Sequence, residues 1–238
     1  MGSSILVDFL GSPNNPAAFG PFVEAVSLTW WNERGKGAVK LLKIGVDYRF
    51  GKVWLIPIFL LWPVIMGGAL AISILTGEGV PELFWVSNPL LIVFSFFLNL
   101  IYDGPLEEEF GWRGYALDRL QSRFNALISS IILGFIWGLW HIPNFWISEA
   151  IIYQYMWGLI FSDILIAILL TWLYNNTGGS ILVALIFHTM FILATNMFPA
   201  LATQQGSLFY LIFIIAAVIA VVAIWGPRRL VRETKKTG

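Results

Sequence analysis

Long apolar stretches, separated by short polar segments, follow one another along most of the chain. A helix that crosses the hydrocarbon core of a membrane needs about 20 mostly apolar residues. Six stretches meet this requirement: 53–76, 83–102 (with a continuation to 121), 126–145, 153–174, 181–198 and 207–226. A weaker seventh, at about 13–31, contains three prolines and Glu24. The pattern predicts an all-α, polytopic transmembrane helical bundle of about seven spans.

Composition indicates a membrane protein. Of the 238 residues, 58% are hydrophobic and 12% are charged, about half the charged fraction of a soluble domain. The length predicts a single membrane domain over 1–238. The absence of cysteine excludes disulfides, thiolate metal sites and a cysteine nucleophile. The first twelve residues lack a basic n-region, so no signal peptide is predicted, and they are compatible with a longer natural N-terminus.

Lysine and arginine are concentrated in a few regions of the chain: a basic segment at 34–52, the region leading to a turn near 122–125, and a basic tail at 227–238. Other connecting segments have neither residue: 77–82, 146–152 and 199–206. Cytoplasmic loops are enriched in lysine and arginine, so the basic segments are predicted to be cytoplasmic, with the N-terminus outside and the C-terminus inside. The uncharged segment 175–180 is predicted on the same side.

Within the basic segment, residues 35–49 are open to two interpretations, a basic segment lying at the membrane interface and a solvated loop. The net charge of zero says nothing about nucleic acid. The expected partners are membrane lipids and a substrate, without nucleic acid.

The stretch EEEFGWRG at 107–114 places three acids and an arginine within an otherwise apolar chain. If the helices on both sides of the turn near 122–125 are continuous, they form an antiparallel hairpin. Glu108 and His141 then each lie about 25 Å from the turn, at about 1.5 Å per residue, and face each other at mid-membrane depth. Gly111 and Gly114 are positions at which the first helix could bend. The alternative is that the span stops at Tyr102 and the acids are solvated in a loop.

His188 lies about eight residues, or about 12 Å, into the span 181–198, so it reaches the same layer. His141 and His188 are the only histidines. Each alone is compatible with a simple helix–helix hydrogen bond. Together with a carboxylate at the same depth they indicate function, because ionisable groups in a bilayer are costly and rare.

The chemistry of these groups suggests roles. A buried carboxylate can act as general base on a water molecule, and Glu109 and Arg113 have the i, i+4 spacing of a favourable ion pair. A histidine facing the base can orient the water or hold a metal, and a second can stabilise an oxyanion. Asp163 is interpreted first as an interhelical hydrogen-bond partner and second as a catalytic group. The chain has no HExxH zinc motif and no GxSxG serine elbow.

Segments of the region from about 90 to 200 resemble the motifs of the CAAX-processing and bacteriocin-processing (CPBP) intramembrane proteases. EEEFGWRGYALDRLQ at 107–121 is similar to their EExxxR motif, through Glu108, Glu109 and Arg113. GFIWGLWHIPNFW at 134–146 is similar to the second motif, an aromatic residue followed after three residues by histidine, here Trp137 and His141. LLTWLYNNTGGSILVALIFH at 169–188 resembles the segment that carries the later histidine.

The resemblance implies a helical membrane protease whose active-site cavity lies between helices and opens to the cytoplasm. It implies that Glu108 activates water with His141, that Glu109 and Arg113 support it, and that His188 binds the oxyanion. The family's oxyanion partner is an asparagine four residues after that histidine.

This sequence departs from the pattern, because position 192 is isoleucine. Asn196 and Asp163 are candidate substitutes, and Trp137 is a candidate supporting residue. Whether the reaction uses a divalent metal such as zinc stays open, and Glu108, His141 and His188 would be the minimal ligand set of that metal.

The sequence therefore predicts a CAAX protease-like endopeptidase of the cell membrane that hydrolyses a peptide bond with glutamate-activated water, with or without metal assistance. Its expected substrate is a peptide or a lipidated protein. One alternative is a non-catalytic membrane scaffold or bacteriocin self-immunity protein of the same family, and the departure at Ile192 motivates it. A second alternative, an ion- or proton-coupled transporter, predicts two related halves with paired broken helices, and the sequence has no second acidic cluster.

Overall fold

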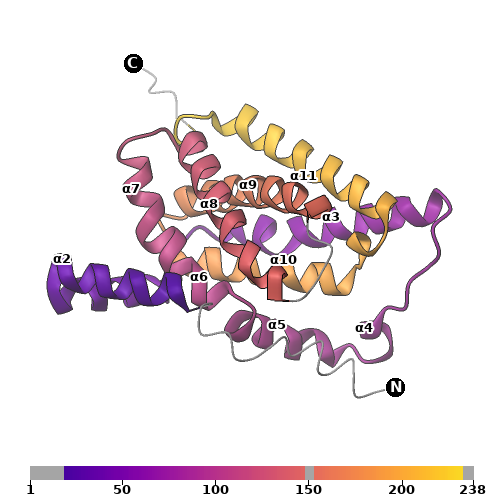
Figure 1. Cartoon of the computed structure of the whole chain (residues 1–238), viewed down its shortest axis with the longest axis horizontal. Coiled ribbons are helices and arrows are strands. Elements are labelled where there is room, and N and C mark those ends of the chain that lie inside the picture. The colour runs from indigo at the N-terminus through magenta and orange to yellow at the C-terminus, as the bar shows by residue number, and fades with distance from the viewer. Residues whose placement is uncertain (1–18, 148–152, 233–238) are drawn as a thin grey trace.

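The computed structural model describes residues 19–147 and 153–232, and within these ranges all regular secondary structure is helical (Figure 1). The predicted all-α fold is confirmed. The start of the predicted span 13–31 and the end of the predicted tail 227–238 lie outside the described residues.

Several helices reproduce the predicted spans closely. α3 (Leu55–Leu75), which follows a short 3-10 turn η1 (Lys52–Trp54), α9 (Tyr153–Asn176) and α11 (Gln204–Trp225) are long and apolar enough to cross a membrane. α8 (Ala126–Ile147) and α10 (Ile181–Met197) occupy two further predicted spans, with shorter apolar stretches. By length and composition the described residues contain three helices that could span a membrane. A bent pair of helices would be a fourth span if the two are taken together, whereas about seven spans are predicted.

That bent pair corrects the prediction of one continuous helix from 83 to 121. The short α4 (Phe84–Ser87) and α5 (Leu90–Tyr102) end before α6 (Pro105–Gly111), which is bent from α5 by 45°. At the break Gly104 has a φ of +105°, a conformation that glycine adopts readily, and Pro105 has no N–H to continue the preceding helix. The bend therefore lies before the acids and not at Gly111 or Gly114.

After α6 the chain continues through a π-helical segment, η2 (Trp112–Leu117), into α7 (Asp118–Gln121), and α8 begins at Ala126. The predicted turn near 122–125 is thus confirmed, and α6 to α8 form an antiparallel hairpin. A second short 3-10 turn, η3 (Ala200–Ala202), joins α10 to α11.

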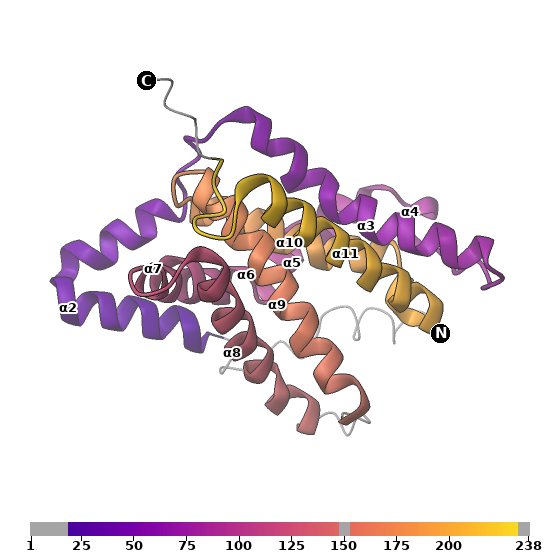
Figure 2. The ribbon, with the colours of Figure 1, turned by 90° about the horizontal axis from the view of Figure 1, so that it is seen from above.

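The N-terminal region differs most from expectation. The described part of the weak span 13–31 and most of the segment 35–49 form one helix, α2 (Gly20–Ile44). Figure 2 shows this helix bent near its middle into two arms. α2 is not among the described helices apolar enough to span a membrane, because its charged residues interrupt the apolar run. The solvated-loop alternative is wrong for residues 35–44, which are helical.

Both arms of α2 pack against the motif helix α6. The Phe22 and Phe110 rings meet edge to face with centroids 5.2 Å apart. A Cβ at Gly111 would lie 2.5 Å from Pro21 Cβ, and a Cβ at Gly45 would overlap the Phe110 ring. Small residues at these contacts allow the close approach that holds α6 in place.

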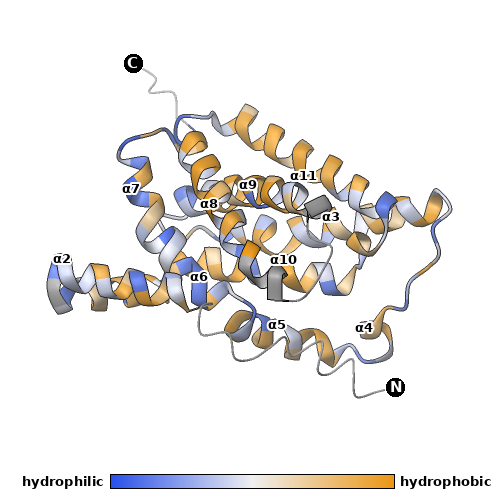
Figure 3. Ribbon diagram, in the orientation of Figure 1, coloured by the Kyte–Doolittle hydropathy of each residue, from blue (hydrophilic) through white to orange (hydrophobic). Residues whose placement is uncertain are grey.

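The main hydrophobic core lies between α3, α8, α9, α10 and α11 and is centred on large buried side chains such as Trp62, Trp137 and Phe187. Figure 3 shows hydrophobic residues covering most of these helices, whereas hydrophilic residues gather on α6, α7 and the connecting loops. The polar motif is therefore carried by a short, bent segment inserted beside an apolar bundle.

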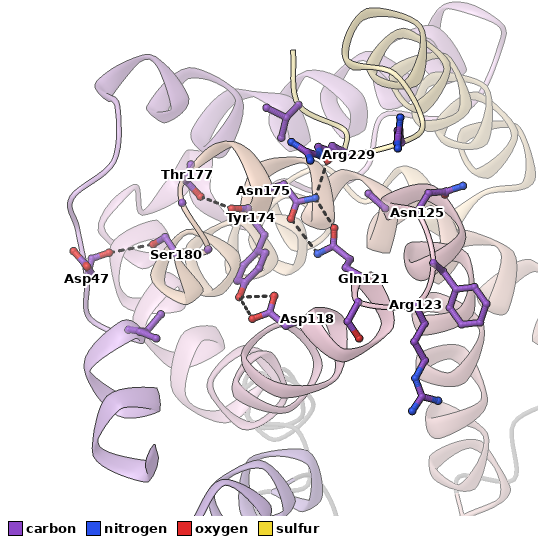
Figure 4. A pocket seen from close by; sticks show the side chains of 18 of the residues that line it. Asp47, Asp118, Gln121, Arg123, Asn125, Tyr174, Asn175, Thr177, Ser180 and Arg229 are labelled. Atoms are coloured by element: carbon purple, nitrogen blue, oxygen red, sulfur yellow. Dashed lines mark hydrogen bonds between the residues drawn. The ribbon is translucent and has the colours of Figure 1, made fainter. Parts of the chain in front are cut away.

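Segments far apart in the sequence meet at one end of the bundle. The loop before α3, the turn between α7 and α8, the turn between α9 and α10, and the last described residues line one pocket of about 850 Å³ (Figure 4). Its lining includes Arg49, Arg123, Arg228 and Arg229, so the structure brings the predicted basic segments together, with the uncharged segment 175–180 beside them. Asn175 Nδ2 donates to the Arg229 carbonyl at 2.8 Å and fixes the tail there.

Candidate active site

Glu108 lies on α6 and is buried, with 7% of its surface exposed. Its Oε2 accepts a hydrogen bond of 2.5 Å from the indole Nε1 of Trp137 on α8. Trp137 is one helical turn before His141, so the hairpin places Glu108 beside this part of α8, as predicted. The solvated-loop alternative for the acids is wrong: α5 does end at Tyr102, but the acids that follow are helical and buried.

Glu109, Arg113 and His188 form a sealed ion network. Arg113 Nη1 donates to Glu109 Oε1 at 2.9 Å, and His188 Nδ1 is 2.9 Å from the same oxygen. The side chains of Glu109 and Arg113 are fully buried, and that of His188 is 6% exposed. The predicted i, i+4 ion pair is confirmed, and α10 supplies a third member to it. Because an ionised carboxylate only accepts hydrogen bonds, Nδ1 of His188 carries the proton.

The rest of the Arg113 guanidinium faces an aromatic ring. Its Cζ lies 5.0 Å from the centre of the Trp137 ring, within the range of a cation–π interaction. Among the described residues, Arg113 Nε and Nη2 and Glu109 Oε2 have no hydrogen-bond partner. Trp137 therefore binds Glu108 through its edge and supports Arg113 through its face.

His141 on α8 pairs with Asp163 on α9. His141 Nδ1 lies 3.0 Å from Asp163 Oδ2, with side-chain exposures of 25% and 6%. The prediction that Asp163 is an interhelical hydrogen-bond partner is confirmed. Because the Asp163 carboxyl is bound by His141, the structure gives no support to Asp163 as a ligand of the oxyanion.

Two glycines bring α8 and α9 close enough for this pair. A Cβ at Gly134 would lie 2.5 Å from Ile164 Cα, and a Cβ at Gly138 would lie 2.8 Å from Ile160 Cα. Glycines four residues apart let helix backbones approach in this way. Side chains lean toward the N-terminus of their own helix, so in this antiparallel pair His141 and Asp163 lean toward each other.

The two histidine groups meet around Trp137. The His188 ring lies 5.2 Å from the Trp137 ring and the His141 ring 5.6 Å from it, centroid to centroid. Both imidazoles are close enough to Glu108 to interact with it electrostatically. The structure thus brings together the three groups for which the sequence predicts a common depth. In both histidines Nδ1 is bound by a carboxylate, and among the described residues neither Nε2 has a hydrogen-bond partner.

The geometry does not support a metal at the predicted ligand set of Glu108, His141 and His188. Within residues 19–147 and 153–232 no group of three or more histidine, aspartate or glutamate side chains is arranged to hold an ion. The Glu108 carboxylate is bound by the Trp137 indole and does not meet the two imidazoles in one ligand set.

Asn196 is not brought to this cluster. It is exposed on α10, eight residues beyond His188, or about 12 Å along the helix axis. Ile192, at the position of the family asparagine, is partly buried. Neither residue supplies a donor beside His188.

Sequence reasoning missed the glycines that shape the site. The signals were present: Asp-Gly-Pro at 103–105 is a turn sequence followed by a helix start, and Gly134 and Gly138 have the GxxxG spacing of closely packed membrane helices. The Cβ of a larger residue at Gly104 would lie 2.8 Å from Glu108 Oε1. Gly104 therefore leaves the space that the Glu108 carboxylate occupies.

Comparison with known proteins places this arrangement in a family. Residues 52–194, more than half of the chain, match the family described as type II CAAX prenyl endopeptidase, Rce1-like. The chain belongs to this family. The match includes Glu108, Trp137, His141, Asp163 and His188 but ends before Asn196.

A relative in Methanococcus maripaludis named CAAX prenyl protease 2 is 33% identical over 175 residues. The aligned part is 68% of this chain and 63% of the relative, so the chain matches less than two thirds of the relative's length. Membership of this membrane protease family, together with the apolar helices, indicates an integral membrane protein.

Proposed function

We propose that the protein is an intramembrane endopeptidase of the CAAX prenyl protease type and that Glu108 is its general base. The observation that carries this proposal is the position of Glu108, a buried carboxylate held by the Trp137 indole next to two imidazoles. Buried carboxylates next to histidines are costly in a membrane and are expected where chemistry requires them.

In the proposed first step Glu108 removes a proton from a water molecule, and the water oxygen attacks the carbonyl carbon of the scissile peptide bond. The Trp137 N–H binds Oε2 and leaves Oε1 to accept that proton. His141 is held by Asp163 through Nδ1, so its unprotonated Nε2 faces the water as a hydrogen-bond acceptor and orients it.

The attack moves an electron pair onto the carbonyl oxygen. A protonated His188 donates from both ring nitrogens, so it stays bound to Glu109 through Nδ1 while Nε2–H binds the oxyanion. The oxyanion then reforms the carbonyl, the C–N bond breaks, and the leaving nitrogen takes the proton held by Glu108. Glu109 and Arg113 act as positioning residues that fix the His188 ring.

The substrate that we propose is a prenylated protein or peptide, by analogy with the relative named CAAX prenyl protease 2. The membrane holds the lipid of such a substrate, and the peptide reaches the site from the end where the basic segments gather. By the distribution of lysine and arginine, we assign this end to the cytoplasm. The membrane that we propose is the cell membrane.

The test is cleavage of a farnesylated CAAX peptide, and of a panel of leader peptides, by the purified full chain in detergent, followed by mass spectrometry. Glu108→Gln keeps the size of the side chain and an oxygen acceptor for Trp137 but removes the base. We expect the rate to fall by about 10²- to 10⁴-fold. Glu107→Gln is the matched control, because Glu107 is an adjacent buried acid whose side chain makes no hydrogen bond to the cluster within the described residues, and it should retain activity. Wild-type rates in Glu108→Gln would contradict the assignment.

The alternative is a non-catalytic membrane scaffold or self-immunity protein. Ile192 favours it, because the oxyanion would then have one donor fewer than the family pattern supplies. This alternative predicts no product from correctly folded wild-type protein, together with unchanged function in vivo for Glu108→Gln.

A further inference from the structure

The C-terminal arm of α2 and the loop after it form a groove that plays no part in the proposed reaction. It has a volume of about 760 Å³, and its lining includes Lys36, Lys40 and Lys43 from the helix and Asp47, Tyr48 and Arg49 from the loop. It adjoins the pocket of Figure 4, with which it shares Ile44, Asp47 and Arg49. A basic groove therefore lies at the end of the bundle where the basic segments meet.

The positive charge in this groove is largely unmatched. The three lysines are spaced at i, i+4 and i+7, so they lie on one face of the helix, and all are exposed. The carboxylate in the lining, Asp47, is taken by Arg49 through Nη2–Oδ2 and Nε–Oδ1 contacts of 2.7 and 2.9 Å. These hydrogen bonds lower the pKa of Asp47 to about 2, so it stays ionised and paired at neutral pH. Among the described residues no acid forms a salt bridge with the three lysines.

An apolar stripe runs beside the lysines on the same arm. Val39, Leu42 and Val46 are 51%, 43% and 69% exposed, whereas Ala38 and Leu41 are buried against the rest of the protein. One side of the arm thus packs inward, a second is exposed and apolar, and a third is basic. Helices with this division lie in the interface of a membrane, with the apolar side toward acyl chains and the basic side toward headgroups.

We propose that this groove binds the phosphate headgroup of an anionic phospholipid, with the apolar stripe against its acyl chains. Three unpaired lysines complement a phosphate, and the stripe selects a lipid over a free anion. Lysine binds phosphate as a point charge, so exchange of the headgroup alcohol matters less than the charge of the lipid.

The arm that binds this lipid also packs on the motif helix. Leu41 is buried in the cluster that contains Phe110, and Gly45 lies against the Phe110 ring. Phe110 directly follows Glu109. A lipid bound in the groove therefore stabilises the arm against α6, and we expect anionic lipid to raise the midpoint of thermal unfolding.

The test uses the full chain in neutral detergent, titrated with phosphatidylglycerol or phosphatidylcholine and read by native mass spectrometry. We expect wild type to prefer phosphatidylglycerol and the variant Lys36→Gln/Lys40→Gln/Lys43→Gln to lose affinity by about fivefold per lysine removed. Lys52→Gln/Arg228→Gln/Arg229→Gln removes the same charge from exposed positions that do not line this groove, and should bind as wild type does. The rise in thermal midpoint with phosphatidylglycerol should follow the same order.

Equal binding by wild type and the lysine variant would overturn the proposal, and so would equal affinity for the two lipids. Displacement of the lipid by inorganic phosphate at matched concentration would show that the groove binds a free anion, which also overturns it. If the triple variant does not fold, Lys40→Gln alone is measured, with an expected loss of about fivefold. None of these outcomes depends on peptidase activity.

Discussion

The two histidines of the cluster lie in surroundings that differ in exposure. His188 belongs to a sealed half with Glu109 and Arg113, in which the three side chains are 6%, 0% and 0% exposed. His141 belongs to a more open half with Asp163, and its own side chain is 25% exposed. Trp137 lies between the halves, and Glu108 is bound to it.

This difference indicates a division of labour. In the sealed half, the ion network joins α6 to α10 through Glu109 and His188. Because these side chains are buried, solvent cannot replace a partner that is lost. In the open half the His141 side chain is accessible from the protein surface, as the water of the proposed hydrolysis requires, and a lost interaction there is less costly than in the sealed half. Variants in the sealed half should therefore affect stability most, and variants in the open half should affect activity more than stability.

The largest effect on stability is expected from Arg113→Met. Methionine fills much of the volume but leaves the buried Glu109 without its counter-charge, so the free energy of unfolding should fall by about 3 to 5 kcal/mol. The measurement is denaturant unfolding in detergent. Arg119→Met is the control, because Arg119 is exposed on α7, and it should cost less than about 1 kcal/mol. Wild-type stability in Arg113→Met would remove the distinction between the halves.

An intermediate effect on stability is expected from Gly104→Ala. Gly104 lies against Glu108, which is bound to Trp137 between the two halves. The φ of +105° strains any larger residue by about 1 to 3 kcal/mol, and the new Cβ would lie 2.8 Å from Glu108 Oε1. Displacement of this carboxylate should lower peptidase activity by about 10²-fold.

Gly77→Ala is the matched control for this prediction. Gly77 has a similar φ of +112°, but a Cβ there would meet nothing within 4 Å. Both variants should lose similar stability, and only Gly104→Ala should lose activity. A parallel loss of activity in both would assign the effect to backbone strain and not to the space that Glu108 needs.

The smallest effect on stability is expected from Asp163→Asn in the open half. The asparagine oxygen can still accept from His141, whose side chain is 25% exposed, so the free energy of unfolding should change by about 1 kcal/mol. Activity should fall by about 10- to 100-fold, because the charge that orients the imidazole is lost. The turnover number and the Michaelis constant, measured separately, should show the loss in turnover. A stability loss as large as that of Arg113→Met would contradict the proposed openness.

The positions of the cluster in the sequence could be predicted because helices convert spacing into depth. Counting residues from the turn near 122–125 places Glu108 opposite α8, and the i, i+4 spacing predicts the Glu109–Arg113 pair. The isolation of Asp163 in an apolar span predicts its interhelical hydrogen bond. These inferences depend on local geometry alone, which the sequence determines directly.

The remaining features depend on tertiary contacts. The pattern of apolar residues does not reveal that α5 and α6 are separate; the local signal of that break is the Asp-Gly-Pro turn at 103–105, and its angle depends on how α6 packs against α2. The shared use of one Glu109 oxygen by Arg113 and His188 depends on the position of α10. The π-helical segment 112–117 has no signal in the hydrophobic pattern, and the distance of Asn196 from His188 follows from the uninterrupted helix between them.

The break in the predicted span 83–121 has a consequence for how the protein is made. α6 and the segment after it carry three acids and an arginine within seven residues. The translocon inserts each such residue into the bilayer only at a cost of about 2.5 to 3.5 kcal/mol, so this segment does not partition into lipid by itself. It needs Trp137 from α8 and His188 from α10, both of which leave the ribosome later. We expect α6 to stay at the membrane surface during synthesis and to enter last, once the helices that follow it have been inserted.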